Sequence, residues 1–227
     1  MKVEKINHYK DKFKKHLHQL VEDYTPYEEA YKYENLLNFQ QNWDLGDLDF
    51  HSIFNKSFKS KISNKLWGGS KDSPKSMMLE FINLNKEFVR TAFRDLFNEE
   101  KDITMRINRF GFHCDQMLDQ SLEAKKKFNT HHHEDRKMAA LYLSFNAPEL
   151  YTLFEYPIFK KTMELLDTRS VPEKFEIERY FKLSKGLNTL ISKDEELMEW
   201  HKELIKPYDQ VHFGQMIVHD FYIFCGS

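Results

Sequence analysis

Glycine and proline are scarce in this chain, with seven and six copies among 227 residues. Proteins built from short strands and tight turns use both residues heavily, because glycine supplies positive φ angles and proline presets turn geometry. Their scarcity leaves long stretches without a strong helix breaker. The composition therefore favours a helical protein over a turn-rich β architecture.

Cysteine is almost absent, and long apolar runs are missing. Cys114 and Cys225 lie far apart in the sequence, so they form neither a disulfide framework nor a closely spaced pair of metal ligands, and we expect two reduced, buried thiols. No stretch approaches the roughly 20 apolar residues of a membrane helix. The N-terminal sequence MKVEKINHYKDKFKK lacks the apolar core of a secretion signal. We therefore expect a cytoplasmic protein that does not contact a membrane.

A large excess of positive charge is missing as well. A net charge of −2 and a pI near 6.6 argue against a general nucleic-acid coat, which has to neutralise many phosphates. Acidic residues concentrate at 44–50 and 193–200, whereas lysines concentrate elsewhere, so any basic surface must be local. Aromatic residues make up 15% of the chain, which excludes the disordered class and indicates an aromatic-rich core.

Apolar residues recur with helical spacing from one end of the chain to the other. Ile6, Phe13 and Leu17, for example, fall near one face of an N-terminal helix. The segment 150–156 is the likeliest strand, but a lone strand has no partner. The sequence therefore predicts an all-α fold of about eight to ten helices with little or no sheet.

Two helix starts have a recognisable signature. Thr25 and Ser73 are candidate N-caps, and each is followed by a proline at the first helical position, where the missing N–H is tolerated. No internal repeat, low-complexity tract or proline/serine linker divides the chain, so we expect a single helical domain over residues 1–227. If there are two lobes, the sequence places their meeting point near residues 129–133.

The stretch NTHHHEDRKMAALYLSF, residues 129–145, raises the question of a metal site. Side chains at successive positions point about 100° apart on a helix and to opposite sides of an extended segment. At most His131 and His133 could therefore share a face, and further ligands would have to come from elsewhere. This spacing leads us to expect no metal site and no cofactor.

A helix start is the favoured interpretation of the same stretch. Glu134 and Asp135 would lie in the first helical turn, where negative charge complements the helix dipole. The histidines would then be free to be exposed. Apolar residues at helical spacing would form the buried stripe that follows: Met138, Leu141, Tyr142 and Phe145.

Catalytic motifs are missing. No phosphate-binding loop, G-x-S-x-G motif or dinucleotide fingerprint occurs. His219 and Asp220 resemble the central pair of HD-type phosphohydrolases, but such a site needs another carboxylate well downstream, and the sequence stops seven residues later. We interpret the pair as a local contact on an amphipathic helix. We expect no catalytic residues, and a helical metal-dependent hydrolase remains an alternative.

Lysines are concentrated between Lys56 and Lys75, with a tryptophan and a Gly-Gly pair at the centre of the stretch. Lysines next to a close-approaching backbone can contact phosphates, and an exposed aromatic ring can stack on a base. The alternative is a solvated loop whose tryptophan fills the core. The candidate DNA-binding residues are Lys56, Lys59, Lys61, Lys65, Trp67 and Lys71.

Five phrases together resemble the helical region that precedes the AAA+ motor in bacterial McrB-type restriction proteins. They extend over roughly residues 35–224 and are NFQQNWDLGDLDFHSIFNKSF, LWGGSKDSPKSMMLEFI, VRTAFRDLFNEEKDITMRINRF, HHHEDRKMAALYLSFNAPELYTLFEY and IERYFKLSKGLNTLISKDEEL. The resemblance implies a DNA-recognition module, often for modified cytosine. A C-terminal or separate AAA+ motor would translocate, and a nuclease subunit would cut.

The resemblance transfers no base-contacting residue. Reading a modified base by flipping requires an aromatic pocket, for which Trp43, Trp67, Tyr142 and Tyr151 are candidates by residue type. An alternative class of function is a protein-interaction module that docks on a motor or nuclease partner, which an exposed apolar patch would indicate.

Overall fold

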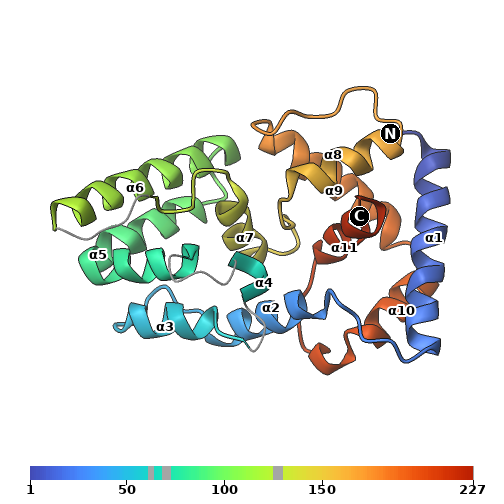
Figure 1. Ribbon diagram of the computed structural model, residues 1–227, viewed down its shortest axis with the longest axis horizontal. Coiled ribbons are helices and arrows are strands. Elements are labelled where there is room, and N and C mark those ends of the chain that lie inside the picture. Colours follow the sequence, from blue (N-terminus) through green and yellow to red (C-terminus); the bar gives the residue numbers. More distant parts are fainter. Residues whose placement is uncertain (61–63, 68–72, 125–129, 227) are drawn as a thin grey trace. The chain divides into compact units, whose positions relative to one another are not determined.

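The computed structural model describes residues 1–60, 64–67, 73–124 and 130–226 of the chain, and it is all-α. Within these residues it has eleven α-helices and one short 3-10 helix, and no strand (Figure 1). The predicted all-α fold is confirmed. The sequence favoured a strand over residues 150–156, but this segment forms no strand, and residues 151–155 are an irregular connection before α8 (Tyr156–Leu165). No helix among the described residues combines the length and the apolar character needed to cross a bilayer.

Contacts between Cα atoms divide the chain into two units. Unit 1 comprises Met1–Tyr33 and Ala147–Ser227, and unit 2 comprises Glu34–Asn146. The chain passes from unit 1 to unit 2 inside helix α2 (Ala30–Asn42). It returns to unit 1 directly after helix α7 (Lys137–Asn146), whereas the sequence placed the meeting point of two lobes near 129–133. That the whole chain behaves as one domain stays a prediction.

Unit 1 is arranged around a buried C-terminal helix. Helix α11 (Met216–Gly226) is apolar on nearly all sides and packs against three other helices of the unit. Helix α1 (Val3–Glu22) packs against α10 and α11, and the predicted stripe of Ile6, Phe13 and Leu17 is buried. The ring centroid of Phe13 lies 5.7 Å from that of Phe221 on α11. The other elements are α1 (Val3–Glu22), α8 (Tyr156–Leu165), α9 (Ile177–Ile191), α10 (Glu195–Leu204) and the 3-10 helix η1 (Lys206–Tyr208).

Unit 2 is built on two long helices, α5 and α6, which lie side by side (Figure 1). Between them and the shorter helices lies the expected aromatic core. The ring of Phe93 is fully buried and its centroid lies 5.0 Å from that of Tyr142 and 5.2 Å from that of Phe110. The described helices of the unit after α2 are α3 (Phe50–Ser57), α4 (Asn64–Trp67), α5 (Pro74–Leu96), α6 (Ile103–Glu123) and α7.

One of the two predicted helix starts is confirmed and the other is wrong. Ser73 caps α5 by accepting a hydrogen bond from the backbone N–H of Ser76, and Pro74 occupies the first position. Thr25 instead belongs to the end of α1. Tyr24 adopts a left-handed conformation, with φ of 53°, and the N–H of Thr25 donates to the carbonyl of Leu20. A helix C-terminus therefore uses the residue that resembled an N-cap.

Replacing Phe93 with alanine should destabilise unit 2 strongly. The substitution removes a fully buried ring that contacts several other rings, and the cavity left behind should cost about 3–5 kcal/mol of unfolding free energy. Phe112→Ala on α6 is the matched control, because Phe112 is 58% exposed and its loss should cost less than about 0.5 kcal/mol. Urea unfolding followed by circular dichroism measures both. Equal losses would contradict the proposed core.

Candidate functional site

The histidine segment is a tight turn that precedes α7. His132 and Arg136 have positive φ angles of 60° and 68°, which a helix excludes. Helix α7 begins only at Lys137, whose N–H donates to the carboxylate of Asp135 at 3.0 Å. The prediction that Glu134 and Asp135 lie in the first helical turn is therefore wrong. The left-handed conformations of His132 and Arg136 keep residues 131–136 out of the helix.

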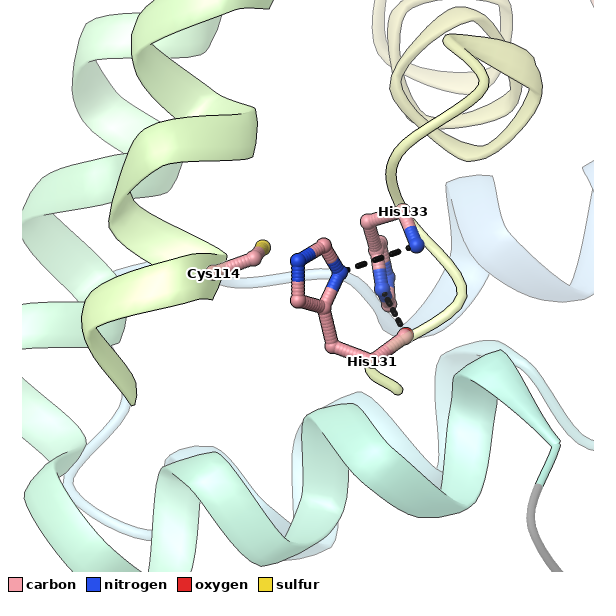
Figure 2. Close-up of side chains that lie close together, drawn as sticks. All are labelled: Cys114, His131 and His133. Carbon is pink, nitrogen blue, oxygen red and sulfur yellow. Dashed lines mark hydrogen bonds between the residues drawn. The ribbon is translucent and has the colours of Figure 1, made fainter. Parts of the chain in front are cut away.

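Two of the three histidines point into the protein. His131 and His133 are 1% and 2% exposed, so the prediction that they would be free to be exposed is wrong for both. They approach Cys114, a buried residue of α6 (Figure 2). One nitrogen from each imidazole and the sulfur of Cys114 all lie within 4.8 Å of one another. The fold thus supplies the third donor that the sequence spacing did not reveal.

Hydrogen bonds fix both imidazoles. The backbone N–H of His133 donates to His131 Nδ1 at 3.0 Å. The ring nitrogen Nδ1 of His133, in turn, lies against the backbone carbonyl of His131. His131 Nε2 lies 2.9 Å from a carboxylate oxygen of Asp115, and His133 Nε2 lies 3.0 Å from the hydroxyl of Tyr142. Burial lowers the pKa of His133 to about 3, so its imidazole is neutral at physiological pH.

Cys114 is not an activated nucleophile in this arrangement. Burial, together with the nearby negative charges of Asp115 and Glu134, raises the pKa of its thiol far above the usual range. A thiol attacks only as the thiolate, so these surroundings disfavour cysteine catalysis. A bound cation could instead stabilise the thiolate form of Cys114.

A pocket of about 260 Å³ opens beside the two histidines. Its walls include Asp115 and Arg136, and the guanidinium of Arg136 donates to the side-chain oxygen of Asn108 at 3.3 Å. His131 and His133 also line this pocket, whereas Cys114 does not. Both imidazoles therefore border the pocket while remaining almost fully buried.

A second polar cluster is buried in unit 1, around Asp220. The carboxylate accepts a hydrogen bond from Tyr27 at 2.6 Å and another from Tyr33, and it forms an ion pair with Lys32. His201 Nε2 lies 3.5 Å from the same carboxylate oxygen that the two tyrosine hydroxyls contact. The interpretation of His219 and Asp220 as a local contact on one helix is therefore wrong, because the partners of Asp220 come from other elements.

Lysine fills the place that a metal would need in this cluster. Glu29, His219 and Asp220 bring three ligand atoms close together, but Lys32 Nζ lies 2.7 Å from Glu29 and 3.0 Å from His219 Nδ1. Burial raises the pKa of the Asp220 carboxyl, but the charge of Lys32 and the hydrogen bonds outweigh burial and lower it overall. The carboxylate is thus ionised and fully paired, as in a structural ion-pair network.

Three of the candidate lysines are exposed in the described part of the lysine-rich stretch. Lys56, Lys59 and Lys65 are exposed, while Lys61 and Lys71 lie outside the described residues. Trp67 is half-buried, with its ring centroid 5.5 Å from that of Phe58, edge to face. It therefore neither fills the core completely nor stands free in solvent.

Lys75, next to this stretch, has a structural role. Its ammonium donates to the carbonyls of Asn55 and Phe58, both at 3.0 Å, at the end of α3. Burial and the positive charge of Lys59 lower its pKa to about 8. Because Lys75 donates to the carbonyl of Phe58, the residue directly before Lys59, the two lysines lie in the same part of the surface.

Two of the four aromatic residues considered for a base pocket lie in hydrophobic cores. Tyr142 and Tyr151 are 1% and 7% exposed, so neither offers a face for stacking. Trp43 is half-buried and packs against several core rings, with its centroid 4.9 Å from that of Phe39. Only Trp67 of the four lies on the lysine-rich stretch.

No model of a known protein family, no curated protein and no solved structure matches this chain. The function therefore has to be inferred from the residues themselves.

Replacing Lys32 with methionine should destabilise unit 1. The substitution leaves Asp220 buried without its positive partner, at a cost of about 3–5 kcal/mol. Adding Asp220→Leu should recover part of the loss, because the unpaired charge is then removed. Lys206→Met is the control, since the exposed Lys206–Glu203 pair is worth about 0–1 kcal/mol. Thermal unfolding measures the stability of the three variants. A Lys32→Met variant as stable as the wild type would contradict the ion-pair network.

Proposed function

We propose that the chain is the DNA-recognition module of a McrB-type restriction system. The observation that supports the proposal best is the grouping of exposed Lys56, Lys59 and Lys65 with half-buried Trp67, in the stretch where the sequence predicted DNA contacts. Lysines supply phosphate contacts and the aromatic ring a stacking surface. Selection of a modified cytosine, an AAA+ motor, a nuclease subunit and a cytoplasmic location belong to the same proposal.

The electrostatics of this surface support a polyanionic partner. Burial, and to a lesser extent the positive charge of Lys59, lower the pKa of Lys75. A phosphate placed at this surface would relieve the repulsion between the two ammonium groups. The chain as a whole carries a net charge of −2, so binding should be confined to this surface.

The same proposal assigns the chemistry to other subunits. Neither buried polar cluster presents an activated nucleophile, since the thiol of Cys114 is held protonated and Asp220 is paired with Lys32. A hydrolytic metal centre at His219 and Asp220 is disfavoured because Lys32 occupies the cation position. The proposed module is therefore a specificity element without catalysis of its own.

Replacing Lys56, Lys59 and Lys65 with glutamine should weaken duplex binding and flatten its salt dependence. Each lost phosphate contact should reduce the slope of log affinity against log salt by about one unit. The control changes Lys160, Lys182 and Lys185 to glutamine, which alters the net charge equally with exposed lysines of unit 1. The measurement is fluorescence anisotropy at several salt concentrations with plain, methylated and hydroxymethylated duplexes.

Equal effects of the two triple variants would show that only net charge matters and would contradict the assigned surface. No binding of any duplex by the wild type at low salt would contradict DNA recognition itself. A preference for a modified base should survive in the lysine variant and disappear in Trp67→Ala, because stacking rather than charge would carry it.

Duplex affinity should fall as the pH rises through about 8. Lys75 has a pKa of about 8 in the free protein, and a nearby phosphate favours its protonated form, so binding takes up protons in this range. Lys75→Gln should remove this pH dependence. Lys59→Gln should shift it to higher pH, because it removes a like charge beside Lys75. Anisotropy titrations between pH 7 and pH 9 test this, and identical profiles for all three proteins would contradict it.

A protein-docking function is the second candidate. Met105 and Phe112 are 41% and 58% exposed and lie seven residues apart on α6, so they share a face of that helix. A contiguous exposed apolar patch marks a surface that another protein can cover, and these two side chains would belong to such a patch. If the chain binds no duplex, this face becomes the better candidate for the contact with a motor or nuclease.

A further inference from the structure

We propose that Cys114, His131 and His133 bind one Zn²⁺ ion, which joins helix α6 to the turn before α7. The proposal is independent of DNA recognition and concerns only residues inside unit 2. It replaces the expectation of no metal site, which was based on sequence spacing alone.

The donor set suits zinc. One sulfur and two imidazole nitrogens lie within 4.8 Å of one another. To reach zinc distances of about 2.3 Å for sulfur and 2.0–2.1 Å for nitrogen, each imidazole would exchange one of its present hydrogen bonds for the ion. Figure 2 shows the Cys114 side chain directed toward the His131 ring, with the His133 ring alongside. Sulfur and imidazole donors select zinc over magnesium or calcium, which prefer oxygen ligands.

The surroundings of the donors also fit a metal centre. Asp115 lies 2.9 Å from His131 Nε2, and a carboxylate beside the imidazole is the usual outer partner of a zinc-bound histidine. His133 Nδ1 lies against the carbonyl of His131, which holds its ring in place. The three donors are almost fully buried, so the ion would be shielded from bulk water.

Three protein ligands leave one position of a tetrahedral zinc ion unfilled. Both histidines line the pocket of about 260 Å³, so a water molecule can supply the fourth ligand from that side. On binding, the thiol of Cys114 releases its proton to solvent and the resulting thiolate coordinates the ion. The centre would hold the histidine turn against α6.

The experiment uses the full chain, stripped with a chelator and titrated with Co²⁺ and with Zn²⁺. Cobalt is the probe because a cobalt–thiolate bond gives a charge-transfer absorption band. We expect one Co²⁺ per chain with this band, displacement of the cobalt by Zn²⁺, and a midpoint of thermal unfolding that rises with Zn²⁺ concentration. Wild-type protein that binds no Co²⁺, or binds it without the thiolate band, would overturn the proposal without recourse to any variant.

Variants assign the ligands. Cys114→Ser should abolish the thiolate band, and His131→Ala and His133→Ala should each weaken binding at least about tenfold; Asp115→Asn should weaken it about 10–100-fold. Cys225→Ser and His132→Ala are the controls and should bind as the wild type does, because neither residue belongs to the donor set. Circular dichroism verifies that each variant is folded. Loss of the band in Cys225→Ser but not in Cys114→Ser would overturn the assignment.

Discussion

Burial of the Asp220 carboxylate is the constraint on which unit 1 depends. A carboxylate removed from water has to be surrounded by positive charge and hydrogen-bond donors. Lys32, Tyr27 and Tyr33 supply these groups, and all three come from the first 33 residues, whereas Asp220 lies on α11 near the other end of the sequence. The N-terminal segment and α11 therefore have to fold together. This explains why unit 1 combines both ends of the chain, while unit 2 is one continuous segment.

Unit 2 combines an aromatic core with a polar turn that is anchored in it. Tyr142 contacts Phe93 in the core through its ring, and its hydroxyl lies 3.0 Å from His133 Nε2. The turn is thereby held where its two buried histidines meet Cys114. Lys56, Lys59 and Lys65, in the same unit, are exposed. Interior polar groups thus organise the unit.

Local signals were most reliable where a single element determines the outcome. The Ser73–Pro74 start was predicted correctly, because capping depends on neighbouring residues only. The N-cap predicted at Thr25 was wrong because the end of α1 uses the same residues, with a left-handed turn at Tyr24. The helix start predicted at Glu134 and Asp135 was wrong for a similar reason. Two left-handed residues, His132 and Arg136, interrupt the segment in which the charges indicated a first helical turn. Competition between adjacent elements cannot be decided from the residues of one of them.

The sequence by itself determined that the protein is helical, that its core is aromatic and that many of its lysines concentrate between residues 56 and 75. Periodicity and composition suffice for these properties, because they depend on which face of each helix is apolar. Only the tertiary structure decided which faces meet. It brings Cys114 of α6 to the two histidines of the turn before α7, and it brings Lys32 to Asp220 from the opposite end of the sequence. Periodicity identifies the buried face of a helix and not its neighbour, so the packing of the helices had to assemble both polar clusters.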